Sequence, residues 1–75
     1  MIGTVVRVFL NKGYAFLRGE DSMSYFAHAK DFKDLNLFDC LYEGQKLEFE
    51  PGLAPEQHRS KGNERRAYGI SQCSL

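Results

Sequence analysis

The stretch Lys12-Gly13-Tyr14-Ala15-Phe16-Leu17 alternates aromatic side chains with small or aliphatic ones. Successive side chains of a β-strand point to opposite faces, so Lys12, Tyr14 and Phe16 would share one face. Ala15 and Leu17 would share the other face, and such side chains suit a protein core. A cation beside two aromatic rings is, in contrast, an unusual group to bury. The stretch therefore predicts a strand over residues 14–18 with one core face and one exposed aromatic face.

A second segment, residues 24–29, repeats this pattern. Phe26 and His28 would lie on one face, and Tyr25, Ala27 and Ala29 on the other. The intervening residues 19–22 favour a turn, so the two segments predict a pair of adjacent antiparallel strands. Such a pair would display one flat aromatic platform formed by Tyr14, Phe16, Phe26 and His28.

Two other interpretations of these side chains stay open at this point. Tyr14 and Phe16 would be core residues if the two faces were assigned the wrong way round, and His28 alone would be an ordinary structural histidine. However, an exposed aromatic patch usually has a partner. A nucleobase stacked on an aromatic ring contributes about 1–3 kcal/mol. The platform therefore predicts binding of single-stranded nucleic acid, with Lys12 near a phosphate.

The rest of the chain contains three more strand signals. Residues 2–10 are rich in valine, residues 45–50 alternate polar and apolar side chains, and residues 64–71 form the last candidate. Asn11-Lys12-Gly13 predicts a turn after the first strand. Pro51-Gly52 predicts the end of the fourth strand, because proline disfavours a strand interior.

Two connections have less regular patterns. Residues 31–42 have mixed apolar spacings, compatible with a helical turn followed by an irregular loop, and residues 53–63 predict a long polar loop. Five short strands with one long connection predict an all-β fold, a small closed or nearly closed antiparallel barrel. A chain of 75 residues supports one core. We expect one domain over residues 1–75, with the barrel over about 2–71 and a frayed C-terminal end.

Composition narrows the class of protein. An apolar content of 43% is too high for a disordered chain, and the charges interrupt any membrane span. A basic leader followed by a long apolar run is missing, so we expect a cytoplasmic protein with no membrane partner. Cys40 and Cys73 lie far apart and show no metal-ligand spacing with His28 or His58. Free thiols are the favoured interpretation, a disulfide is the alternative, and no metal or other cofactor is expected.

The charge distribution qualifies the binding prediction. Ten basic and ten acidic side chains give a net charge of zero, whereas nucleic-acid-binding proteins are usually basic. The basic side chains are concentrated between residues 58 and 66, where Glu64 is the single acidic residue. A solvated loop is the simpler interpretation of this run; contact with phosphates beside the aromatic face is the functional one. The basic residues of the run are Arg59, Lys61, Arg65 and Arg66.

Several of these motifs resemble the cold-shock domain family. Residues 12–17 resemble the family's first nucleic-acid-binding motif, K-G-F-G-F-I, and residues 25–29 its second, V-F-V-H-F. Residues 43–49 are similar to the E-G-Q-x-V-x-F of its fourth strand, and Gly3 precedes Lys12 by nine residues, as the family's first glycine does. The resemblance covers residues 3–70. It implies a five-stranded oligonucleotide-binding (OB) barrel that binds single-stranded RNA or DNA, often as an RNA chaperone.

The resemblance also assigns binding positions to individual residues. It places five side chains on the family's binding positions: Lys12, Tyr14, Phe16, Phe26 and His28. Phe38 corresponds to a stacking phenylalanine of the family's loop, although a hydrophobic plug is an equal alternative. Arg7 occupies the place of a tryptophan, where its guanidinium could stack on a base or bind a phosphate. Ala29 replaces a phenylalanine and can do neither. The final loop is longer than the family's and lacks its G-P turn.

Two functions follow as predictions. The first is weakly sequence-selective binding of single-stranded RNA or DNA, as an RNA chaperone or a regulator of transcription or translation. The second is a protein-interaction or self-association module that kept the barrel and lost strong nucleic-acid binding, as a monomer or weak homodimer. We do not expect the protein to be an enzyme or to have a small-molecule substrate. The sequence offers neither a nucleophilic side chain with a plausible general base nor a phosphate-binding glycine loop.

Overall fold

The computed structural model describes residues 1–54 and 65–73, and five strands account for most of this part of the chain. A short helix, α1 (Leu35–Asp39), and two 3-10 turns, Leu10–Lys12 and Ala29–Asp31, lie in the connections. The strands are β1 (Ile2–Phe9), β2 (Tyr14–Gly19), β3 (Ser24–His28), β4 (Lys46–Leu53) and β5 (Arg65–Gln72).

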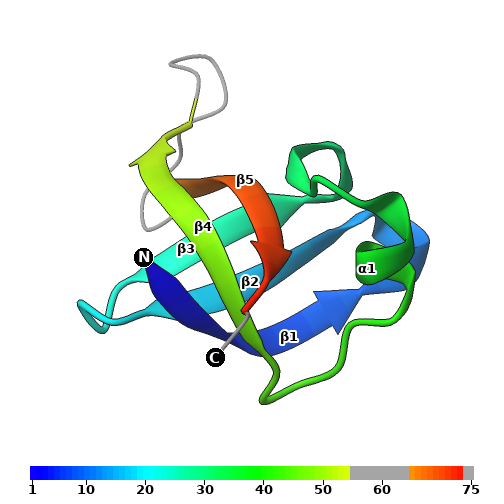
Figure 1. Ribbon diagram of the computed structural model, residues 1–75, viewed down its shortest axis with the longest axis horizontal. Helices are drawn as coiled ribbons and strands as arrows, with labels where there is room; N and C mark the ends of the chain where they lie inside the picture. Colours follow the sequence, from blue (N-terminus) through cyan, green and yellow to red (C-terminus); the bar gives the residue numbers. More distant parts are fainter. Residues whose placement is uncertain (55–64, 74–75) are drawn as a thin grey trace.

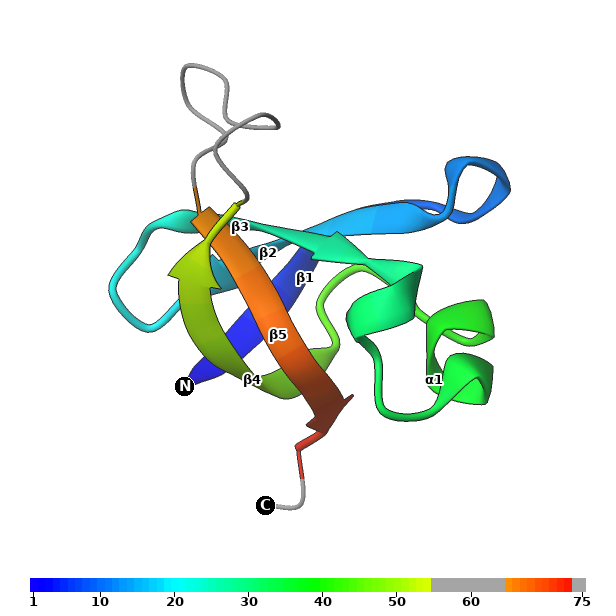
Figure 2. The ribbon, with the colours of Figure 1, turned by 90° about the horizontal axis from the view of Figure 1, so that it is seen from above.

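These strands close into a barrel in the order β1-β2-β3-β5-β4, which confirms the predicted fold class (Figure 1, Figure 2). One pairing differs from the expected antiparallel arrangement, because β3 and β5 run parallel and are joined at Phe26 and Arg66. The other four pairings are antiparallel. The reason is geometric: around a closed ring with an odd number of strands, directions cannot alternate at every pairing. The parallel pairing brings β5 beside the second strand of the aromatic platform.

The β1–β2 hairpin is closed by a left-handed glycine. Gly13 has φ 78°, and its N–H donates to the Phe9 carbonyl at 3.0 Å. Glycine adopts this conformation without the strain that a Cβ would introduce. Lys12 lies in the 3-10 turn, which agrees with the turn predicted at Asn11-Lys12-Gly13.

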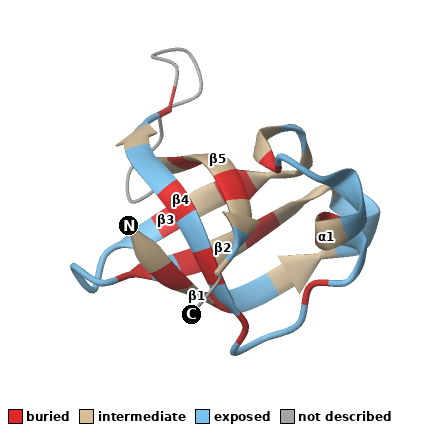
Figure 3. Ribbon diagram, in the orientation of Figure 1, coloured by how far each residue is buried: buried red, intermediate tan, exposed pale blue. Residues whose placement is uncertain are grey.

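The core is filled by inward positions of all five strands (Figure 3). These positions alternate with outward ones on β2 and β3, whereas on β5 they lie three residues apart, at Ala67 and Ile70. Phe32, Phe38 and Leu41 lie between β3 and β4 in the chain and pack against this core. Phe32 and Phe38 meet edge to face, with ring centroids 5.3 Å apart. The buried hydrophobic strand residues are Val5, Ala15, Leu17, Tyr25, Ala27, Leu47, Phe49, Ala67 and Ile70.

The prediction that Pro51-Gly52 ends the fourth strand is wrong, since β4 continues to Leu53. β1 pairs with β4 only from Lys46 to Glu48, so Pro51 lies where β5 is the one described strand beside β4. An edge position tolerates proline because one side of the strand needs no N–H donor. Gly52 is required there by close approach: a Cβ would lie 2.7 Å from the Tyr68 ring.

Within residues 1–54 and 65–73, no helix has the length and apolar character needed to cross a membrane.

A side-chain hydrogen bond stabilises the β2–β3 turn at one end of the barrel. The buried Tyr25 hydroxyl donates to Asp21 Oδ2 at 2.6 Å, and the Met23 N–H donates to Asp21 Oδ1 at 3.0 Å. The Tyr25 hydrogen bond is the main reason why the pKa of Asp21 is lowered, and it also raises the pKa of Tyr25. The positive charge of Arg65 adds to the lowering of the Asp21 pKa and partly offsets the rise of the Tyr25 pKa. A carboxylate with a lowered pKa stabilises the fold only while it is ionised.

We therefore predict that Tyr25→Phe lowers the free energy of unfolding at pH 7, and that this deficit shrinks in acid. Stability from Asp21 is present above the unfolded pKa of about 3.9 and is lost as the pH falls through the lower folded pKa. Urea unfolding of both proteins between pH 7 and pH 2 measures the deficit. A deficit that stays constant over this range would contradict a role for the Asp21 carboxylate.

Candidate nucleic-acid interface

The predicted aromatic platform is present on the outer face of β2 and β3. Their register pairs Tyr14 with His28 and Phe16 with Phe26, and residues directly opposite in an antiparallel pair point to the same face. All four side chains are partly exposed, while Ala15 and Ala27 between them are buried. The faces are therefore assigned as the sequence predicted, and the core interpretation of Tyr14 and Phe16 is wrong.

A fifth ring, Phe9, extends this surface onto β1. A register shift between Val5 and Arg7 places Phe9 opposite Tyr14. Its ring centroid is 5.1 Å from that of Tyr14 and 6.2 Å from that of Phe16. A β-bulge of this kind has no signal in a valine-rich strand, so alternation alone could not locate Phe9.

The rings form one connected cluster. Tyr14 lies 5.7 Å from Phe16 and 5.3 Å from Phe26, centroid to centroid. Phe26 lies 5.8 Å from Phe16 and 6.2 Å from His28. These spacings are within the range of mutually stabilising aromatic contacts. We call this partly exposed cluster the aromatic face, consisting of Phe9, Tyr14, Phe16, Phe26 and His28.

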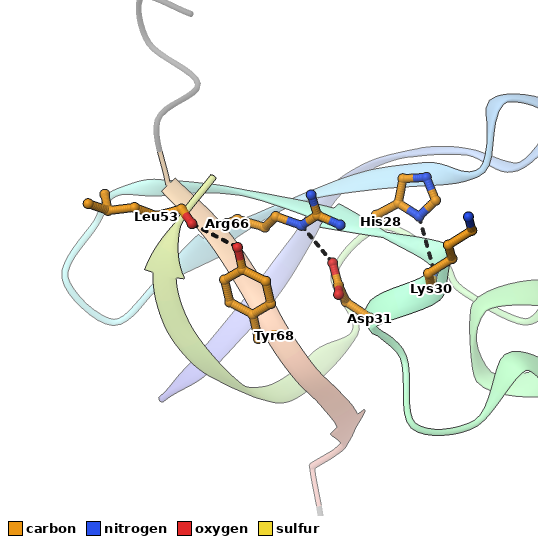
Figure 4. A network of polar contacts seen from close by, with 6 residues as sticks. All are labelled: His28, Lys30, Asp31, Leu53, Arg66 and Tyr68. Atoms are coloured by element: carbon orange, nitrogen blue, oxygen red, sulfur yellow. Dashed lines mark hydrogen bonds and ion pairs between the residues drawn. The ribbon is translucent and has the colours of Figure 1, made fainter. Parts of the chain in front are cut away.

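His28 is held in one orientation by the backbone. Its Nδ1 accepts a hydrogen bond from the Lys30 N–H at 3.1 Å (Figure 4). In the neutral ring the proton is then on Nε2, which leaves an N–H donor at the edge of the aromatic face. His28 thus offers both a stacking ring and a directed donor.

Three cations border the aromatic face. Arg7 is exposed and pairs in register with Phe16, and the exposed Lys12 has its Nζ 5.8 Å from the centre of the Phe9 ring. Arg18 is also exposed and follows Tyr14 and Phe16 on the same face of β2. Arg18 was not among the predicted binding residues, although the same two-residue alternation places it on this face.

Arg66 adds a fourth cation on β5, on the far side of Phe26 from Phe16. Its guanidinium carbon lies 5.8 Å from the Phe26 ring centre and 5.5 Å from that of Tyr68. Its Nε donates to Asp31 Oδ2 at 2.7 Å (Figure 4). Tyr68 is fixed in turn, since its hydroxyl donates to the Leu53 carbonyl at 2.7 Å. Asp31 and Tyr68 had no signal in the sequence, because only the barrel closure brings them to Arg66.

One other predicted cation, Arg65, does not join this surface. Arg65 precedes Arg66 on β5, so its side chain leaves the opposite face of the strand, and its charge acts on Asp21 and Tyr25. Its predicted place beside the aromatic face is therefore wrong. Arg59 and Lys61 lie outside the described residues.

Phe38 is also not part of the interface, and its predicted stacking role is wrong. Only 5% of Phe38 is exposed, because α1 turns the ring inward against Phe32. The hydrophobic-plug alternative describes this residue. Ala29 packs against the core and adds nothing to the aromatic face, as expected.

The described residues offer stacking rings and cations at this surface rather than a metal site. Among the described residues, no group of three or more His, Cys, Asp or Glu side chains could hold a metal ion. Cys40 and Cys73 are free thiols, as favoured from their spacing. Five clustered rings with cations at their border can stack bases and meet phosphates.

Neither a protein-family model nor a curated protein matches this chain.

The burial of Phe38 generates a prediction. Phe38→Leu should lower the free energy of unfolding by about 1 kcal/mol, because a smaller side chain fills the same site imperfectly. It should leave the affinity for single-stranded oligonucleotides unchanged, because the ring does not reach the aromatic face. Urea unfolding and fluorescence anisotropy on one preparation test both parts. A loss of oligonucleotide affinity without a loss of unfolding free energy would show that Phe38 does contribute to the interface.

Proposed function

We propose that this protein binds single-stranded RNA or DNA by stacking bases on the aromatic face. The observation that carries the proposal is the connected cluster of five partly exposed rings, bordered by Arg7, Lys12 and Arg18. Bases of any sequence stack on such rings, and the cations meet the backbone phosphates. Sequence selectivity is accordingly weak.

The affinity follows from what the surface contains and lacks. Several stacking contacts of about 1–3 kcal/mol each are offset by the cost of ordering a flexible strand. A net charge of zero provides little long-range attraction. We expect a dissociation constant on the order of micromolar, about −8 kcal/mol or weaker.

The resemblance to the cold-shock domain family supports the same function. The barrel order and the positions of Tyr14, Phe16, Phe26 and His28 are compatible with it. Weak, unselective binding to single strands suits an RNA chaperone, or a regulator that binds exposed RNA segments. Free Cys40 and Cys73 thiols fit a reducing compartment, so we place this function in the cytoplasm.

A second candidate function is self-association or binding of a protein through the same face. The zero net charge favours it, because charge repulsion would not oppose two copies meeting. Five partly exposed rings would also bury well against a second apolar surface. A dimer formed in this way would occlude the rings and compete with nucleic acid.

We predict that Tyr14→Ala and Phe26→Ala each weaken binding of a short labelled RNA about 5- to 150-fold, the equivalent of about 1–3 kcal/mol per stacked base. Tyr42→Ala is the matched control, since Tyr42 is 63% exposed in the loop before β4 and lies outside the aromatic face. Fluorescence anisotropy at low and moderate salt measures the affinities.

The two candidate functions give different results in this experiment. Saturable binding that weakens with salt, prefers single strands to duplex and depends on Tyr14 and Phe26 supports the first. No binding at low salt and high protein concentration would retire it. Light scattering that reports a dimer, converted to a monomer by Phe26→Ala, would support the second.

A further inference from the structure

The guanidinium of Arg66 is held in place from several sides. Both Arg66 and Asp31 side chains are only 16% exposed, and the Nε–Oδ2 hydrogen bond fixes one edge of the guanidinium. Its central carbon also lies over the Phe26 and Tyr68 rings, 5.8 and 5.5 Å from their centres. The bond to Asp31 uses Nε, so the two terminal nitrogens drawn in Figure 4 keep N–H groups for a ligand. The edge left for a ligand is therefore a rigid pair of N–H donors beside Phe26.

The carboxylate of Asp31 changes which ligand suits this edge. A salt bridge at 2.7 Å offsets most of the arginine's positive charge. A phosphate brought to the same guanidinium would also meet the repulsion of Asp31. A neutral ligand with two neighbouring acceptor atoms meets no such repulsion and still receives both hydrogen bonds.

Resting on the proposed function, we infer that Arg66 recognises a guanine adjacent to the base stacked on Phe26. Guanine is the base that presents two neighbouring acceptors, O6 and N7, to an arginine fork. Adenine presents a donor beside N7, and cytosine and uracil have no N7 acceptor. Tyr68 and Asp31 act as positioning residues for Arg66. The protein then has one guanine-selective position within an otherwise unselective surface.

Modified bases test this inference without changing the protein. The probes are labelled pyrimidine RNA strands of equal length that contain one guanine, inosine, 7-deazaguanine or adenine. We expect the guanine strand to bind about tenfold more tightly than the all-pyrimidine strand. Inosine keeps O6 and N7 and should match guanine, whereas 7-deazaguanine lacks N7 and should bind like adenine.

Two variants separate base recognition from phosphate contact. Arg66→Lys keeps the charge and a partner for Asp31 but loses the fork, so the guanine preference should disappear while binding to the pyrimidine strand is retained. Asp31→Asn removes the competing carboxylate, so we expect tighter binding to every strand and a smaller guanine preference. The salt slope, which is the slope of log affinity against log salt concentration, should become steeper by about 0.7. Arg65→Lys, at the neighbouring β5 position outside the aromatic face, is the matched control and should keep the guanine preference. Circular dichroism confirms that each variant is folded.

The possible outcomes are distinct. Equal binding of the guanine and pyrimidine strands would overturn the inference and leave the proposed function intact. If the guanine and pyrimidine strands bind equally and Asp31→Asn also leaves the salt slope unchanged, the positioning role of Asp31 is contradicted as well. A failure of all strands to bind would overturn both the inference and the proposed function.

Discussion

The register between β2 and β3 is the constraint on which the rest of the surface depends. Pairing Phe16 with Phe26 places Tyr14 opposite His28 and directs Ala15 and Ala27 inward. A shift of one residue would exchange the two sets, burying the rings and exposing the alanines. Burial of the inward residues within the closed barrel opposes such a shift. The register that fills the core is therefore the same register that exposes the aromatic face.

Barrel closure converts this two-stranded pattern into a wider site. On one side, β1 brings Phe9 and Arg7 to the rings of β2. On the other side, the parallel pairing with β5 brings Arg66 beside Phe26. The aromatic face is therefore bordered by cations from strands that lie far apart in the chain, although the net charge is zero. Charge placement, rather than total charge, determines what such a surface attracts.

The Asp31–Arg66 pair shows how an acid can refine a cationic surface. A free arginine beside aromatic rings would bind any phosphate, which carries no sequence information. An arginine oriented and partly neutralised by a carboxylate favours neutral acceptor pairs on a base edge. The same charge balance that reduces overall affinity can thus provide selectivity at one position.

The sequence by itself determined the strand pattern, the hairpin at Gly13, the inward and outward sets on β2 and β3, and therefore the platform of Tyr14, Phe16, Phe26 and His28. These features depend on alternation and turn chemistry, which act over a few residues. Only the tertiary structure decided the place of Phe9, the burial of Phe38, the position of Arg66 beside Phe26, and the contacts of Asp31 and Tyr68. Those positions depend on a bulge and on the pairing of β5 with β3, where residues far apart in the chain meet and no local pattern records the register.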